Sequence, residues 1–317
     1  MRIALTRLLT LVPVLLLVSL GTFLLVDLGP GDPAAELLGS SGSAEDYARI
    51  RDEMGLDRPL AQRYVEWLGD AVHGDLGRNL VPPTESVSGR LARAFPVNLE
   101  LAALALGMAL VASIPLALWS AYRAGSRVDR WISAGTVGLI SVPSFLAGLV
   151  LLLVFAINVR MFPLGQWARP SEAGWAENIS HAFLPALTLA LQEMPVFTRL
   201  LRSDMVSTLR EDYILAARAK GLPTWHVLFR HALRPSSFSL LTLAGVSVGR
   251  LIGGTIVVEA VFQLPGTGSV IIEAAERNDY KLVQGGVLFI AVVYLVVNLV
   301  VDLLYGYLDP RIRRGAA

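Results

Sequence analysis

The stretch Asp212-Tyr-Ile-Leu-Ala-Ala-Arg-Ala-Lys-Gly-Leu-Pro-Thr-Trp-His-Val-Leu-Phe-Arg-His-Ala-Leu-Arg-Pro235 is polar and lies between two long apolar runs. Ionised side chains are costly in hydrocarbon, so this stretch belongs in water at a membrane surface. We interpret residues 212–235 as a docking element and call them the docking segment. Its basic and imidazole side chains are Arg218, Lys220, His226, Arg230, His231 and Arg234.

The docking segment has the composition of two short helices joined by an elbow. Residues 213–220 are good helix formers with one β-branched residue, Ile214. Gly221 suits the positive φ of a helix end, and Pro223 prevents continuation of the helix. Residues 225–233 predict a second helix with apolar residues along one side.

An ordinary basic loop that contacts only lipid headgroups is the alternative for this segment. Such a loop needs neither a glycine elbow nor an aromatic stripe. It also has no use for the small Ala216, Ala217 and Ala219, which would let the backbone of a partner come close. The combination therefore favours docking.

The segment resembles the "EAA" loop of ABC-type importer permeases, the binding-protein-dependent transport inner-membrane components. Ala216, Ala217 and Gly221 match its two alanines and its glycine. Leu215 replaces the glutamate and Pro235 comes one position late, as in the dipeptide/oligopeptide/nickel permease branch. The resemblance implies a coupling helix that contacts an ATPase subunit through Tyr213, Ala216, Ala217, Arg218, Ala219, Lys220, Gly221, Trp225 and His231.

The composition is that of a polytopic membrane protein. The 317 residues are 54% hydrophobic and 17% charged, against about a quarter charged in soluble domains, and the mean hydropathy is +0.57. The chain has no cysteine, so disulfides and thiolate metal sites are excluded. The net charge of +1 carries no information about partners by itself.

We predict an all-α protein with six transmembrane helices of the ABC importer permease type. Residues 1–28 form the first helix, 29–96 an extracytoplasmic helical segment, 97–309 a five-helix core with the coupling loop at 201–236, and 310–317 a tail. Basic residues concentrate in the short loops on the side of the docking segment, so both termini are expected in the cytoplasm of a bacterium. The predicted spans are 8–28, 99–122, 131–159, 182–200, 238–261 and 283–307.

The extracytoplasmic segment predicts two helices of its own. Residues 45–54 follow Ser43 as a cap, and residues 59–72 carry an apolar stripe that we expect to pack on the outer ends of the spans. A small, loosely attached domain is the alternative. Gly55-Leu-Asp-Arg-Pro-Leu60 is similar to the outer segment of dipeptide permease subunits.

Glu193, Arg250 and Asp302 fall inside predicted spans, where an ionised side chain is costly and needs a reason. Glu193 and Arg250 depart from the family pattern, and we expect them to face the central pathway within reach of one another or, equally well, to form a buried structural pair. Asp302 fits a structural ion pair near the inner surface. A Ser141-Val-Pro-Ser-Phe145 break is expected to kink the third span.

The loop after the fifth span looks like the corresponding loop of the same family. Its Pro265, Gly266 and Gly268 form a rigid turn. With Glu259 and Asp279 they are candidates for an outer gate or a receptor contact. Lys281, where the family often has proline, is a departure.

The chain has no sequence motif of an enzyme. No Gly-x-x-x-x-Gly-Lys-Ser/Thr stretch is present, and His73, His181, His226 and His231 have no metal-ligand spacing. A membrane-embedded enzyme is therefore disfavoured. We expect no cofactor on this chain, with ATP and Mg²⁺ on ATPase subunits.

The resemblance implies one permease subunit of an importer, most simply for di- or oligopeptides. Its expected partners are a second permease subunit, two ATPase subunits or domains, an extracytoplasmic solute-binding protein and the bilayer, with no nucleic acid. Nickel or another non-peptide solute stays open. An ion-gradient-driven transporter with Glu193, Arg250 and Asp302 as a relay is the other alternative, but no inverted repeat supports it.

Overall fold

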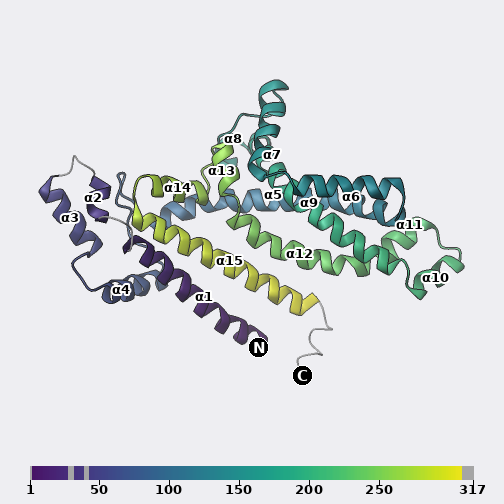
Figure 1. Ribbon diagram of the computed structural model, residues 1–317, viewed down its shortest axis with the longest axis horizontal. Coiled ribbons are helices and arrows are strands. Elements are labelled where there is room, and N and C mark those ends of the chain that lie inside the picture. Colours follow the sequence, from purple (N-terminus) through teal and green to yellow (C-terminus); the bar gives the residue numbers. More distant parts are fainter. Residues whose placement is uncertain (1, 28–31, 39–42, 309–317) are drawn as a thin grey trace. The chain divides into compact units, whose positions relative to one another are not determined.

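The computed structural model describes residues 2–27, 32–38 and 43–308, and this part of the chain is helical (Figure 1). Its one extended pairing is an isolated bridge between Arg78 and Ser86. The predicted all-α class is therefore confirmed. The predicted tail at 310–317 lies outside the described residues. By contacts the chain forms two compact units, Met1–Val97 with Pro265–Leu299 and Asn98–Leu264 with Val300–Ala317.

The first unit combines the start of the chain with part of its C-terminal region. A cluster of Leu76, Val87, Leu91 and Leu282 forms its apolar core, and Leu15 packs against it. The helices of this unit are α1 (Arg2–Asp27), α2 (Pro33–Leu38), α3 (Ala44–Met54), α4 (Leu60–Val72), the start of α5 (Val87–Tyr122), α14 (Thr267–Glu276) and most of α15 (Tyr280–Leu308).

The helices between residues 43 and 72 follow their sequence signals. Ser43 caps α3 in a capping box with Asp46, and Gly55 ends that helix at φ 64°. The α4 stripe packs on α1: Tyr64 lies edge-on to Phe23 with ring centroids 5.5 Å apart, and its hydroxyl is 2.8 Å from the Ser19 hydroxyl. The expectation that this stripe packs on a predicted span is confirmed.

The second unit is built around the long helix α9 (Trp175–Thr208), which packs against α6 (Arg127–Ile140), α7 (Ser144–Leu151) and α12 (Arg234–Gly253) (Figure 1). Pro185 and Pro195 lie inside α9 without ending it, as membrane helices tolerate. The remaining elements are η2 (Leu152–Asn158), α8 (Pro170–Ala173), α10 (Asp212–Ala219), α11 (Thr224–His226), η3 (Val227–Leu233) and α13 (Ile256–Phe262).

The described residues support a multi-pass protein without fixing six spans. Three helices are long and apolar enough to cross a membrane, at Val87–Tyr122, Thr224–Gly253 and Tyr280–Leu303, and two bent helix pairs raise the number to five. Helix α1 contributes a shorter apolar stretch, Leu11–Leu24. The count of six remains a prediction.

Two predicted spans are not continuous helices. The third breaks at Ser141–Pro143, as expected, but α6 and the helix beginning at Ser144 meet at 101°, which is far more than a kink. The fifth was predicted to run to Val261 and instead ends at Gly253. A side chain at Gly254 would lie 2.8 Å from the Arg250 carbonyl oxygen, so glycine permits the close turn that stops α12.

The second short helix of the docking segment is also not separate. After the three residues of α11 the chain continues through the π-helix η3 directly into α12. Pro235 lies within this continuous helix, where its missing N–H leaves the His231 carbonyl without the usual α-helical partner. Two helical arms joined at Gly221 are present, but the prediction that the second is short is wrong, because Pro235 does not end it.

Asp279 fixes the start of α15, and its removal tests this role. Its buried carboxylate accepts from the backbone N–H groups of Leu80 at 3.2 Å, Val81 at 3.4 Å and Leu282 at 3.3 Å. Asp279→Ala leaves these donors without an acceptor, so we expect a loss of about 2 kcal/mol in the free energy of unfolding and a lower thermal midpoint in detergent. Asp279→Asn keeps one acceptor oxygen and should lose clearly less; equal losses would contradict this role.

Candidate functional site

The elbow of the docking segment is a complete Schellman motif. Gly221 has φ 77°, the Leu222 N–H donates to the Ala217 carbonyl at 3.3 Å, and the Gly221 N–H donates to the Arg218 carbonyl at 2.9 Å. A Cβ at Gly221 would meet no atom within 4 Å, so only the backbone conformation demands glycine there. The sequence expectation of a helix end at positive φ is met at this residue.

A small apolar core holds α10 against η3. Ile214, Ala217 and Val227 are buried together, with Leu209 and Leu222 packed on them. Ala217 therefore lies inside the helix pair, whereas Ala216 and Ala219 are exposed. Only the latter two can meet a partner directly.

Tyr213 compensates for Pro235. Its hydroxyl donates to the His231 carbonyl at 3.3 Å, and an α-helix would bond that carbonyl to the N–H that Pro235 lacks. Partial burial, aided by Glu211, raises the pKa of the Tyr213 phenol above its usual range. Tyr213 and His231 thus join the two arms of the docking segment.

The docking segment exposes both large apolar side chains and basic ones. Tyr213, Leu215, Trp225 and Phe229 are exposed large side chains. Trp225 stacks edge-on to His226 with centroids 5.4 Å apart. Beside this surface a hollow of about 430 Å³ is lined by Arg210, Arg218, Leu222, Thr224 and Leu228, together with the ends of α5 and α9. Arg218 and Lys220 are the exposed bases of α10 and its end.

A buried ion pair anchors the helix ends near the docking segment. Asp129 is buried and accepts two bonds from Arg202, both 2.6 Å. It also accepts from the Ser120 hydroxyl and from the Gly125 N–H at 2.8 Å. These contacts join α5, α6 and α9. The sequence analysis missed this cluster; Ser126-x-x-Asp129, a helix-cap pattern, was the local signal.

Glu193 and Arg250 form a contact between α9 and α12. Nη2 of Arg250 lies 2.6 Å from Oε2 of Glu193, and the Ser247 hydroxyl donates to the same oxygen at 2.8 Å. The Glu193 side chain is 6% exposed and that of Arg250 is 56% exposed. One member of the pair is buried and the other stands open.

Gln192, the neighbour of Glu193 on α9, is another polar residue inside a predicted span, and it has a structural partner. Its Nε2 donates to the Val142 carbonyl at 3.2 Å. That carbonyl lies at the break between α6 and α7, where helical bonding is interrupted. Gln192 thus satisfies a carbonyl that the break exposes. Asp302, the third predicted intramembrane charge, is half-buried on α15.

The outer candidates are mostly held inside the fold. Glu259 is buried and accepts from Asn98 Nδ2 at 2.6 Å and from the Thr255 hydroxyl at 2.5 Å. Asp279 is the buried clamp described above. Gly266 caps α14, and Gly268 lies buried in its first turn. Pro265 is exposed beside them. Asn98, which the sequence analysis did not single out, is the donor that orients Glu259.

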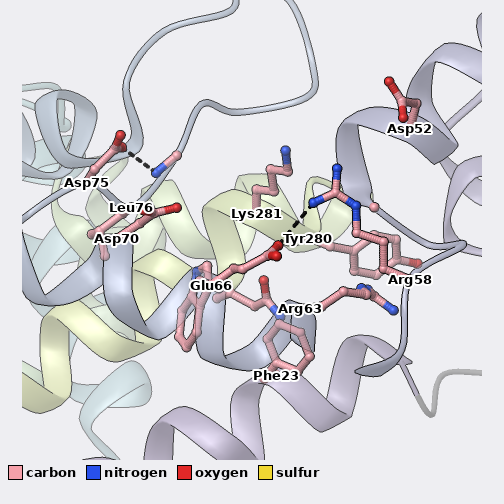
Figure 2. Close-up of a pocket in the computed structure, with 14 residues that line it drawn as sticks. Phe23, Asp52, Arg58, Arg63, Glu66, Asp70, Asp75, Leu76, Tyr280 and Lys281 are labelled. Carbon is pink, nitrogen blue, oxygen red and sulfur yellow. Dashed lines mark hydrogen bonds and ion pairs between the residues drawn. The ribbon is translucent and has the colours of Figure 1, made fainter. Parts of the chain in front are cut away.

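A charged hollow of about 250 Å³ lies in the first unit (Figure 2). Arg58 donates to Glu66 at 3.1 Å across it, and Figure 2 shows Asp70, Asp75 and Lys281 around the same space. Four acids and three bases line it: Asp52, Glu66, Asp70 and Asp75 with Arg58, Arg63 and Lys281. Lys281, which stands where the family often has proline, is one of the bases that line this hollow.

Comparisons with known proteins agree along the whole chain. Residues 113–314 match the family described as "Binding-protein-dependent transport system inner membrane component", and residues 1–102 match its N-terminal counterpart. The chain is 36% identical over 308 residues to a peptide transport system permease protein of Brucella abortus, covering 95% of this chain and 96% of that protein.

A second relative and one solved structure extend this result. The oligopeptide transport system permease protein AppB of Bacillus subtilis is 34% identical, over 96% of this chain and 97% of its own length. The inward-facing MetNI methionine ABC transporter has a similar fold, with a TM-score of 0.54 at 16% identity, covering 69% of this chain and 96% of that chain.

The Asp129–Arg202 anchor predicts non-additive losses of stability. Asp129→Ala leaves a guanidinium without its carboxylate and should cost about 3 kcal/mol, the lower end for buried pairs because the Arg202 side chain is 30% exposed. Asp129→Ala combined with Arg202→Met should cost at least about 1 kcal/mol less than the two single losses together. Thermal unfolding in detergent measures each variant.

Arg210→Met is the matched control, because Arg210 is exposed in the turn after α9. We expect it to change stability by no more than about 0.5 kcal/mol. Strictly additive losses at Asp129 and Arg202 would show that the pair does not act as a unit.

Proposed function

Because the chain belongs to the family of binding-protein-dependent transport system inner membrane components, we propose that it forms one half of the translocation pathway of a peptide importer. It is a permease of the ABC importer type. Peptides are the proposed cargo because relatives that match nearly its whole length carry peptide or oligopeptide permease names. Because the chain belongs to this family, we no longer consider the alternative of a transporter driven by an ion gradient.

ATP hydrolysis is assigned to partner subunits. The complex we propose contains a second permease subunit, two ATPase subunits holding ATP and Mg²⁺, and an extracytoplasmic solute-binding protein. The docking segment lies in the cytoplasm in this proposal, with both termini on the same side. This chain supplies the pathway and the mechanical coupling.

The docking segment is the proposed ATPase contact. The single observation that carries this assignment is the exposure of three large apolar side chains, Leu215, Trp225 and Phe229, on α10 and the α11–η3 helix, which pack around a small buried core. Such surfaces on soluble parts of a protein mark interaction sites. Ala216 and Ala219 allow close approach, and Arg218 and Lys220 suit an acidic rim. Gly221, Ala217, Tyr213 and His231 hold the backbone of the docking segment in place.

Exposed side chains distinguish the proposed lipid face from the pathway face. From Trp131 to Ile157, exposed side chains on α6, α7 and η2 are apolar apart from Ser141 at the break. On α12 the exposed stripe at four-residue spacing includes Thr242, Val246 and Arg250. A stripe with an ionised group is costly against lipid. We assign α12 to the pathway between the two permease subunits.

The outer turn is assigned to the gate or to the solute-binding protein. Pro265 is exposed and can contact a partner. Glu259, Gly268 and Asp279 are buried, so their part is to hold the surrounding backbone in place. Asp302 is assigned a structural role at the inner end of α15.

Removing the indole of Trp225 tests the docking surface. Trp225→Ala should weaken binding of ATPase subunits to the permease in nanodiscs by about tenfold or more, because exposed aromatics dominate interface energies. Trp131→Ala is the control: Trp131 is 78% exposed and Trp225 64% exposed, but Trp131 lies on the proposed lipid face. Equal effects of the two variants, or none, would contradict the assignment.

A further inference from the structure

The guanidinium of Arg250 has unused donors. In the described part of the chain its hydrogen bonds are all made by Nη2, to Glu193 Oε2 at 2.6 Å and to the Ser247 hydroxyl at 3.0 Å. Arginine has five N–H donors, so those on Nε and Nη1 remain available. With 56% of its side chain exposed, Arg250 can reach a ligand without moving away from Glu193.

Glu193 and Ser247 hold the charged guanidinium of Arg250 at the surface of the protein. The buried Glu193 keeps Arg250 in place, and Ser247 fixes the carboxylate by a further bond at 2.8 Å. Glu193 is itself covered by these contacts and is not presented to a ligand. The group offered to a solute on the α12 stripe is therefore a guanidinium, which binds carboxylates with directed hydrogen bonds.

Peptides of different sequence share two charged groups, the terminal ammonium and the terminal carboxylate. A pathway that accepts many side chains can recognise cargo only by such shared features. We propose that Arg250 binds the terminal carboxylate of the peptide during its passage. This inference rests on the proposed function and names the chemical group that the pathway recognises.

The competition from Glu193 suits transport. A transported solute must bind well enough to enter and weakly enough to leave. Glu193 already occupies one side of the guanidinium and offsets part of its charge. A peptide carboxylate is therefore attracted without being trapped. Removal of Glu193 should strengthen this preference, whereas removal of Arg250 should abolish it.

The test compares trialanine with trialaninamide, which lacks the terminal carboxylate. Proteoliposomes contain this chain with its permease, ATPase and solute-binding partners, and the initial uptake rates of the two peptides are expressed as a ratio. Any preference of the binding protein is common to all variants and cancels between them. Arg250→Gln should lower the ratio by about tenfold, the factor expected for a lost charged hydrogen bond.

Three further variants separate this role from a structural one. Arg250→Lys keeps a cation and should retain part of the preference. Glu193→Gln should keep the ratio at or above that of the unaltered chain. If the pair were only structural, loss of Glu193 and loss of Arg250 would change the ratio alike. Arg169→Gln is the control, because Arg169 is also 56% exposed and lies near Glu172, and it should leave the ratio unchanged.

The absence of cysteine permits a second measurement that needs no amidated peptide. Arg250→Cys should lose trialanine uptake and regain it after reaction with aminoethyl methanethiosulfonate, which restores a cation. The sulfonatoethyl reagent should not restore uptake. Recovery with neither reagent, or with both, would overturn the proposal.

The outcomes distinguish this inference from the proposed function. An unchanged uptake ratio in Arg250→Gln overturns the carboxylate contact. An equal loss of uptake of both peptides in Arg250→Gln and in Glu193→Gln also overturns it. The second result would mean that the pair is structural or that it binds an acidic group of the second permease subunit. ATP hydrolysis stimulated by the binding protein would persist in either case. Its absence in the unaltered complex would overturn the proposed function itself.

Discussion

An ionised side chain at the centre of a bilayer costs about 2.5–3.5 kcal/mol even on insertion scales, and this cost accounts for where charge is found in the chain. Arg250 is bonded to Glu193, and Asp129 to Arg202. The apolar stretch from Trp131 to Ile157 presents no charged side chain outward. The same cost predicts that the docking segment lies in water, where its bases are hydrated. The positions of the charged side chains therefore indicate which parts of the molecule can contact lipid and which cannot.

The backbone obeys a related constraint, because each interrupted hydrogen bond needs another partner. Gly221 closes α10 with two bonds of a Schellman motif, and Tyr213 supplies a donor to the carbonyl affected by Pro235. Gln192 serves the carbonyl at the break of α6. The bonds of Gly221 and Tyr213 brace the docking segment from inside. Because η3 continues into α12, a push on the outer surface of this segment would move α12 with it. This continuity gives the proposed coupling a rigid connection.

Features set by neighbouring residues could be predicted from the sequence, and those set by distant residues could not. The elbow at Gly221 and the cap at Ser43 depend on local geometry and were identified in advance. The proximity of Glu193 and Arg250 was one of two alternatives, since unpaired charge is costly in a span. Asp129 and Arg202 are 73 positions apart and could not be matched without the fold. The end of α12 at Gly253 and the continuation through Pro235 were mispredicted, because tertiary packing and the π-helix outweighed the local signals.

Cross-linking from a single thiol tests the central claim, that the docking segment contacts an ATPase, most directly. The chain has no cysteine, so Ala219→Cys on the exposed side of α10 gives one reactive site, and Val150→Cys on the apolar outer face of α7 gives its control. In the assembled complex we predict a cross-link from position 219 to the ATPase subunit and none from position 150. A transporting complex in which no exposed position of the docking segment cross-links to the ATPase would contradict the account.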